Sequence, residues 1–186
     1  MHSAGMILNN DLRRRWHEGL RVDGSTPPLE ITLRCISLLG EPDLVLTTFS
    51  TVAEGTRWQV VASTGTRLLT LKASSAEDRW TWEEVSQRQG MQITPVSSEI
   101  EATVRPLGAV ISVDALPDTS RDEYFHPYRM EGDGLEQARG GWRIHFRDGS
   151  AADLGPGFAY PPTSRAQGQA SEAIVARILD YWDTQG

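Results

Sequence analysis

Hydrophobic side chains near the start of the chain recur with the period of a helix, at Leu12, Trp16 and Leu20. Two asparagines at positions 9–10 can cap such a helix, because an asparagine side chain accepts a hydrogen bond from a free backbone N–H. The polar segment that follows Leu20 contains glycine and a proline pair, which stop helices. The pattern therefore predicts a short helix over residues 9–20.

From residue 29 onward, hydrophobic and polar positions alternate, as they do in β-strands with one buried face. The predicted strands are residues 29–39, 43–52, 57–63, 66–73, 99–105, 109–116 and 142–147, and a short run ending at Leu154. Turn residues join neighbouring strands at Thr64-Gly65, Pro106–Gly108 and Asp148-Gly149. Because these connections are short, we expect a largely antiparallel sheet. Residues 74–90 fit either a helical turn or a strand.

The end of the chain carries the clearest helical pattern. Its hydrophobic stripe is Ala170, Ile174, Ile178 and Trp182, with Val175 and Leu179 beside it. Residues spaced by four lie on one face of a helix, so this stripe should be buried against the sheet. We expect this helix to cover one end of the sheet.

These elements predict an α+β protein that is mainly β and forms a single domain over residues 1–186. Its centre is expected to be a curved antiparallel sheet or partly open barrel, with a short N-terminal helix and a C-terminal capping helix. The strand pattern is lost between Leu116 and Gly141, so residues 117–140 are predicted to be an inserted loop.

Two hairpins carry a resemblance to a known family. The segment RWQVVASTGTRLLTLKA, residues 57–73, resembles the hairpin of bacterial pleckstrin-homology-like domains, in which an aromatic strand leads into an RLL strand. WRIHFRDGSAADL, residues 142–154, is similar to their late hairpin, and the terminal helix stands where that fold places its capping helix. The resemblance covers residues 29–182 and implies a scaffold commonly used for protein contacts. Lipid-binding relatives use a basic cluster between early strands, whereas Glu41 and Asp43 occupy that turn here, so phosphoinositide binding is not implied.

The net charge of the chain argues against some kinds of binding partner. The net charge is -7, and residues 73–186 hold ten basic against eighteen acidic side chains. An acidic protein without a basic stripe is poorly suited to nucleic acid or to an anionic membrane surface. No stretch has the length of a membrane span or the pattern of a signal peptide, which leads us to expect a cytoplasmic protein. Cys35 is the single cysteine, so it cannot form an intramolecular disulfide, and its apolar surroundings predict a buried, inert thiol.

The inserted loop contains the candidate binding residues Tyr124, Phe125, His126 and Tyr128. Tyrosine and phenylalanine are frequent anchors of protein interfaces. In this loop they either contact a partner protein or fold back onto the body as a structural clasp. We expect no metal here, because Asp122, Glu123 and His126 lack the further ligands of a metal site and Pro127 interrupts any helix that would present them together.

The hairpin at residues 142–154 raises the second question of chemistry. His145 shares a strand face with Arg143 and Arg147. This row is either an anion-binding site with a general base or the solvent face of an amphipathic strand, and alternation alone accounts for the second interpretation. No motif of a nucleophilic serine, a phosphate-binding loop or a dinucleotide site is present in the sequence.

The sequence therefore predicts a non-catalytic protein-interaction domain of pleckstrin-homology-like type, without a cofactor and with another protein as partner. Two alternatives stay open. The first is a small hydrolase or ligand-binding enzyme with a site beneath the 117–140 loop, formed by Asp122, Glu123, His126 and His145. The second is a structural subunit that forms a homo-oligomer through an exposed strand edge.

Overall fold

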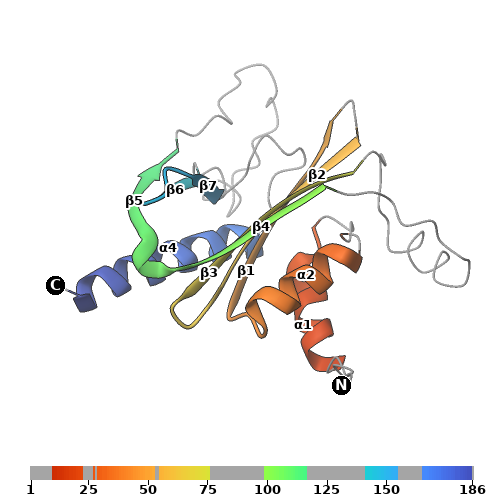
Figure 1. Ribbon diagram of the computed structural model, residues 1–186, viewed down its shortest axis with the longest axis horizontal. Coiled ribbons are helices and arrows are strands. Elements are labelled where there is room, and N and C mark those ends of the chain that lie inside the picture. Colours follow the sequence, from red (N-terminus) through yellow and green to blue (C-terminus); the bar gives the residue numbers. More distant parts are fainter. Residues whose placement is uncertain are drawn as a thin grey trace, which may run out of the picture.

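The computed structural model describes residues 10–22, 27, 29–52, 55–75, 99–116, 141–154 and 165–185 (Figure 1). The helices in this part of the chain are α1 (Asn10–Leu20), α2 (Leu29–Leu39) and α4 (Arg165–Gln185), with a 3-10 turn, η1 (Leu107–Ala109). The strands are β1 (Leu44–Val52), β2 (Gly55–Thr64), β3 (Arg67–Ser75), β4 (Glu99–Pro106), β5 (Val110–Ala115), β6 (Trp142–Phe146) and β7 (Ala151–Leu154). They form two antiparallel sheets, which confirms an α+β fold.

The first sheet is a meander with the order β1-β2-β3-β4. Thr64 pairs with Arg67, so β2 and β3 are joined by the two-residue turn Gly65-Thr66, one position later than the sequence indicated. Gly65 has a φ of 52°, a left-handed conformation that glycine adopts without steric cost. The hairpins expected at residues 57–73 and 142–154 are both present.

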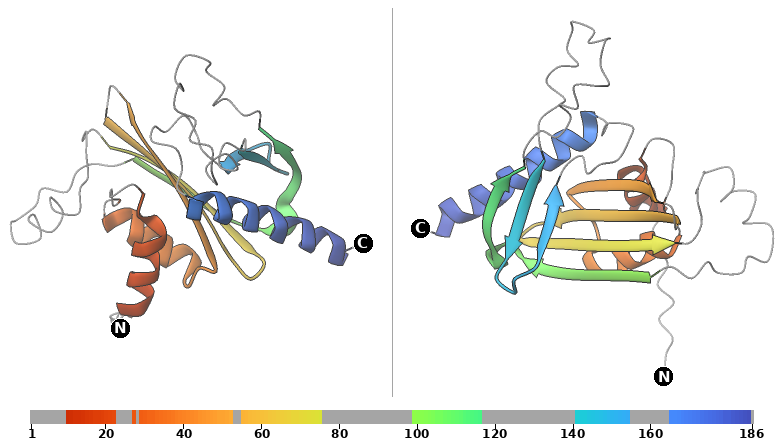
Figure 2. Two further views of the ribbon diagram at one scale, coloured as in Figure 1. Left: turned by 180° about the vertical axis from the view of Figure 1, so that it is seen from behind. Right: turned by 90° about the horizontal axis from the view of Figure 1, so that it is seen from above.

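Helices α1 and α2 cover one face of the first sheet (Figure 2). The core on this side is formed by Trp16, Leu20, Val22, Ile31, Cys35, Ile36, Leu39, Trp58, Val60, Ala62, Leu69, Leu71 and Ala73. The Trp16 indole Nε1 donates a hydrogen bond to the Gly40 carbonyl at 2.7 Å, which fixes α1 against the end of α2. The N-terminal helix predicted from Trp16 and Leu20 is confirmed, since both side chains are fully buried.

The second sheet, in the order β5-β6-β7, and helix α4 pack against the opposite face of the first sheet. This second core contains Leu46, Val61, Leu68, Leu107, Val110, Ile144, Phe146, Ala152, Leu154, Ile174, Val175 and Ile178. Arg177 of α4 donates hydrogen bonds to the Asp43 carboxylate at 2.8 Å and to the Ser63 hydroxyl at 3.0 Å. The C-terminal helix is therefore part of the protein core, as its stripe predicted.

One predicted strand is wrong, because residues 29–39 form helix α2. The buried residues of this segment are Ile31, Thr32, Cys35, Ile36 and Leu39. Their spacing is helical, and Leu33, which alternation would have buried beside Ile31, is 37% exposed. An apolar run of this length can satisfy both periods, and Pro27-Pro28 directly before it suits the start of a helix.

The expected fold class, an antiparallel α+β fold with an N-terminal helix and a C-terminal helix, is confirmed. The two sheets are not closed into a barrel, and helix and strand contents are nearly equal within the described residues. Two finer expectations are corrected. β4 and β5 do not pair across the Pro106–Gly108 turn, because η1 carries the chain from the first sheet into the second. Leu179 was predicted to be buried with the α4 stripe, but it is 44% exposed, and Tyr181 packs against the core instead.

Candidate functional site

The predicted binding residues Tyr124, Phe125, His126 and Tyr128 lie outside the described residues, as does the whole segment 117–140. Their role in binding stays a prediction. The same holds for Asp122 and Glu123, which the enzyme alternative would place beneath the loop.

Arg143 and His145 lie on the face of β6 opposite to the buried Ile144 and Phe146, whereas Arg147 lies in the turn after β6 and donates a hydrogen bond to the Gly108 carbonyl at 3.4 Å. Arg143 donates hydrogen bonds to both carboxylate oxygens of Asp153 at 2.6 and 3.1 Å. The Nε2 atom of His145 lies 2.9 Å from Asp114 Oδ2 on β5. Since cross-strand partners account for these contacts, the arrangement fits the solvent face of an amphipathic strand.

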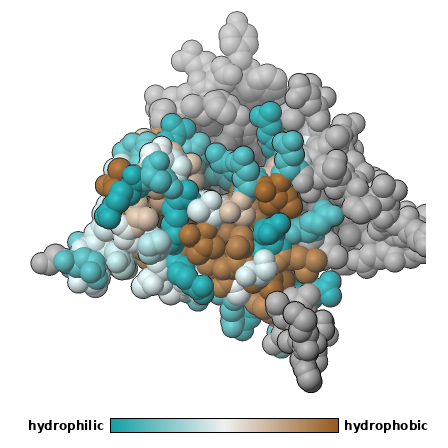
Figure 3. Space-filling model, viewed as in Figure 1, coloured by the Kyte–Doolittle hydropathy of each residue, from teal (hydrophilic) through white to brown (hydrophobic). Residues whose placement is uncertain are grey.

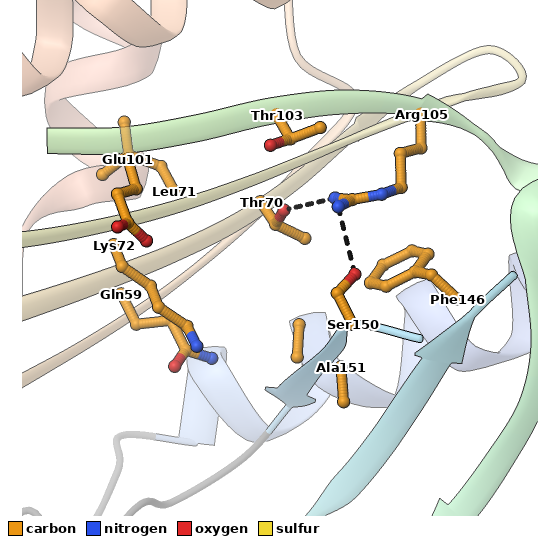
Figure 4. Close-up of a pocket in the computed structure, with 11 residues that line it drawn as sticks. Gln59, Thr70, Leu71, Lys72, Glu101, Thr103, Arg105, Phe146, Ser150 and Ala151 are labelled. Atoms are coloured by element: carbon orange, nitrogen blue, oxygen red, sulfur yellow. Dashed lines mark hydrogen bonds between the residues drawn. The ribbon is translucent and has the colours of Figure 1, made fainter. Parts of the chain in front are cut away.

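A small pocket lies between the first sheet and the β6–β7 hairpin, with a volume of about 120 Å³. Its floor is the polar face of β2, β3 and β4, where Gln59, Thr70, Lys72, Glu101 and Thr103 project (Figure 4). Its opposite wall contains Ser150, Ala151 and Ala152 of the second sheet. The pairing of β2, β3 and β4 brings these floor residues onto one face of the sheet, and the fold places the β6–β7 hairpin opposite them.

Arg105 closes one side of this pocket. Its guanidinium donates hydrogen bonds to the Ser150 hydroxyl at 3.0 Å and to Thr70 Oγ1 at 3.1 Å (Figure 4). It also donates two hydrogen bonds to Asp148 Oδ2, at 2.8 and 3.0 Å. It also lies 4.5 Å from the centre of the Phe146 ring. With its donors directed at these groups, Arg105 serves to join the two sheets rather than to bind a ligand.

The carboxylate of Asp148 is held ionised by its surroundings. The Ser150 hydroxyl and backbone N–H donate hydrogen bonds to it, and Arg105 adds a charged partner. Together they lower the pKa of Asp148 from its ordinary 3.8 to about 2. Arg105, Asp148 and Ser150 thus form a hydrogen-bonded cluster that connects the two sheets beside the pocket.

Strand β4 also forms a free edge of the first sheet within the described residues. Thr64 and Arg67 flank a two-residue turn, so the backbone groups of Arg67 bond to Thr64 on β2. Successive residues of a strand direct their backbone groups to opposite sides, so the even-numbered residues of β3 direct theirs toward β4. Because Leu68 pairs with Arg105, the odd-numbered residues of β4 bond to β3. The hydrogen bond from Leu107 N–H to Thr66 C=O, at 2.8 Å, follows the same rule, because it also joins an odd-numbered residue after β4 to an even-numbered residue before β3.

The backbone N–H and C=O groups of Ile100, Ala102 and Val104 therefore point away from β3, toward the open edge. The next even-numbered residue is Pro106, which has no N–H to donate. These groups are obligatory hydrogen-bonding groups, so the edge can accept an additional strand.

The side chains of these same three residues are half-buried beside the core under α1 and α2. Figure 3 shows an apolar patch over β4 and the neighbouring α2. The free edge is thus bordered on one side by an apolar surface and on the other by the polar pocket floor with Glu101 and Thr103. We refer to this combination as the β4 edge.

The described residues contain no group of three or more histidine, cysteine or acidic side chains that could hold a metal ion. In the same residues, no helix has both the length and the apolar character needed to cross a membrane. Cys35 is fully buried, and burial raises the pKa of its thiol to about 12. The prediction of a buried thiol is confirmed.

No known family model matches this chain, and no curated protein or solved structure is significantly similar to it. The sequence patterns missed the β4 edge, although Ile100, Ala102 and Val104 were assigned to a strand. Edge position depends on the order of strands in the sheet, which alternation does not encode. The signal that was present is Pro106, since proline within a sheet is confined to edges and strand ends.

Proposed function

We propose that this chain is a non-catalytic protein-interaction domain of pleckstrin-homology-like type that binds an extended protein strand at the β4 edge. The observation that carries the proposal is the run of outward backbone groups on β4 between an apolar surface and a polar one. Addition of a strand to such an edge is a common mode of recognition, in which main-chain bonds supply affinity and alternate side chains supply specificity.

The order of the elements supports the family assignment. The β2–β3 and β6–β7 hairpins, which carry the resemblance, are both formed, and α4 follows the second of them. The pocket between the two sheets, at about 120 Å³, is small beside the 300–1,000 Å³ typical of small-molecule sites, so we do not assign a ligand to it. The aromatic residues of segment 117–140, Tyr124, Phe125 and Tyr128, remain proposed as additional contacts.

The proposal is tested with a displayed library of random ten-residue peptides selected on the full chain. Selected peptides should alternate between apolar and polar positions, and their binding should perturb the backbone amide signals of Ile100, Ala102 and Val104. The variant Ala102→Pro should weaken binding by about tenfold or more, because it removes the central outward donor without removing a bond to β3.

Ala102→Val is the matched control, since it keeps the N–H and suits a strand. It should bind the selected peptides within about threefold of the natural chain, given the small packing change. Selected peptides that bind Ala102→Pro as tightly as the natural chain, or that perturb amides elsewhere, would refute the β4 edge as the binding element.

A further inference from the structure

The outward groups of the β4 edge are symmetric about Ala102. Ile100 and Val104 lie two positions to either side of it, and all three residues present their N–H and C=O to the open side. If a second β4 lies antiparallel with Ala102 opposite Ala102 of the second copy, then Ile100 lies opposite Val104 of the second copy. In this register every outward group of the three residues has a partner.

The neighbouring registers fit less well. Centring the pair on Thr103 places Ile100 opposite Pro106 of the second copy, which has no N–H to donate. Centring it on Glu101 places two Glu101 carboxylates directly opposite each other, and like charges in that position are destabilising. The Ala102 register avoids both faults.

The side chains are also compatible in the Ala102 register. On the polar side, Glu99 lies opposite Arg105 of the second copy and Glu101 lies opposite Thr103 of the second copy. On the other side, half-buried apolar residues meet apolar residues. Pairing would therefore remove apolar surface from water without opposing like charges.

The other free edges in the described residues are less suited to this pairing. β7 has only four residues. The register of β5 shifts between Val110 and Ser112, and such a bulge interrupts a strand edge. Helices α1 and α4 both contact β1, so helices flank this edge on both faces of the sheet.

We propose that two copies of this chain associate through antiparallel pairing of β4 about a two-fold axis at Ala102, which joins their first sheets into one continuous sheet. The inference rests on the proposed function, because it names the strand that the β4 edge takes. In the pair, the α1 and α2 helices of both copies lie on one side of the joined sheet, and both second sheets lie on the other.

Cysteine crosslinking of the full chain tests the register. In Ala102→Cys, the two introduced residues would lie about 5.5 Å apart between Cα atoms, within the range of a disulfide. Mild oxidation should give a covalent dimer. Ile100→Cys alone should not, because its two copies lie four residues apart along the strands, about 13 Å. The natural Cys35 is buried and does not compete.

An equal mixture of Ile100→Cys and Val104→Cys supplies the decisive arm. Residue 100 of one copy lies opposite residue 104 of the other, so the mixture should form a mixed disulfide dimer, whereas each variant alone should form no disulfide-linked dimer. Crosslinking of Ile100→Cys alone, or none in the mixture and none in Ala102→Cys, would overturn the proposal.

Sedimentation of the natural chain from about 1 µM to about 1 mM gives the second readout, since these concentrations cover weak and moderate dimers. Ala102→Pro should raise the dissociation constant by about tenfold or more, because the Ala102 N–H is used by both copies. A chain that stays monomeric but binds selected peptides at β4 refutes the dimer and keeps the proposed function. A chain that binds neither a copy nor a peptide at β4 refutes both.

Discussion

Arg105 of β4 and Asp148 of the β6–β7 turn connect the two sheets, with the Arg105 Nη2 atom 2.8 Å from Asp148 Oδ2. The two residues are far apart in sequence, and each is also held by other groups: Arg105 by Thr70 and Phe146, and Asp148 by Ser150. The pair fixes the second sheet over the polar end of the first and thereby sets the shape of the pocket.

Replacing Arg105 by alanine should lower the free energy of unfolding by about 2 kcal/mol, because a charged hydrogen-bond donor and its packed stem are lost together. Arg57→Ala is the control, since Arg57 is exposed on β2, and its effect should stay within about 0.5 kcal/mol. Urea unfolding followed by fluorescence measures both. Equal stabilities of the two variants would show that Arg105 does not join the sheets.

Asp148 should make stability depend on pH in the acid range. Its pKa is lowered to about 2, so the carboxylate is favoured in the folded chain. The resulting stability is present above the ordinary value of 3.8 and is lost as the pH falls toward 2. Asp148→Asn should therefore be less stable than the natural chain at pH 5, and the difference should shrink toward pH 2. A constant difference across this range would contradict the assignment.

The exposed position of Leu179 gives a test of how α4 packs. Ile178 is fully buried, so Ile178→Ala should lower the free energy of unfolding by about 2–5 kcal/mol. Leu179→Ala removes a side chain of the same size at a position that is 44% exposed, and its cost should be below about 1 kcal/mol. Thermal unfolding of both variants measures the contrast, and a reversed order would mean that α4 is rotated about its axis.

Gly19 of α1 should resist the substitution that usually stabilises helices. Alanine normally gains about 1 kcal/mol over glycine inside a helix. Here an added Cβ would lie 2.8 Å from the Val45 Cβ atom, so Gly19→Ala should instead cost about 1–3 kcal/mol. The double variant with Val45→Ala should recover part of this loss, giving a coupling above about 0.5 kcal/mol. Additive single effects would show that the two residues do not meet.

The sequence predicted the elements whose hydrophobic period is long and unmixed, namely α1, α4 and the two hairpins. It failed at α2, where Ile31, Cys35 and Leu39 satisfy a helical spacing while Leu29 to Cys35 also alternate. Such a run is decided by what lies opposite it, and here a sheet face rather than a neighbouring strand covers it. The expectation that Leu179 is buried was wrong for a related reason, because the width of the buried stripe on α4 depends on the surface against which the helix packs.

The candidate site was less accessible to sequence patterns than the fold. The sequence predicted that Ile100, Ala102 and Val104 lie in a strand. It did not predict that their backbone groups point outward, because this depends on the strand order β1-β2-β3-β4 and on the two-residue length of the β2–β3 turn. The contact between Arg105 and Asp148 could not be predicted from the sequence, because two residues that are far apart in the chain form no recognisable spacing pattern. The prediction about Tyr124, Phe125 and Tyr128 concerns residues outside the described part of the chain.

The packing of α4 has a consequence for synthesis of the chain. Leu46, Val61 and Leu68 of the first sheet pack in one core with Ile174 and Ile178 of α4. Of these five residues, the ribosome adds Ile174 and Ile178 last. At about 5–20 residues per second, the interval between Leu68 and Ile178 is roughly 5–20 s. During that time the first sheet can form its hairpins but lacks its final apolar cover. The nascent chain therefore carries an exposed hydrophobic face that a chaperone can hold until α4 emerges.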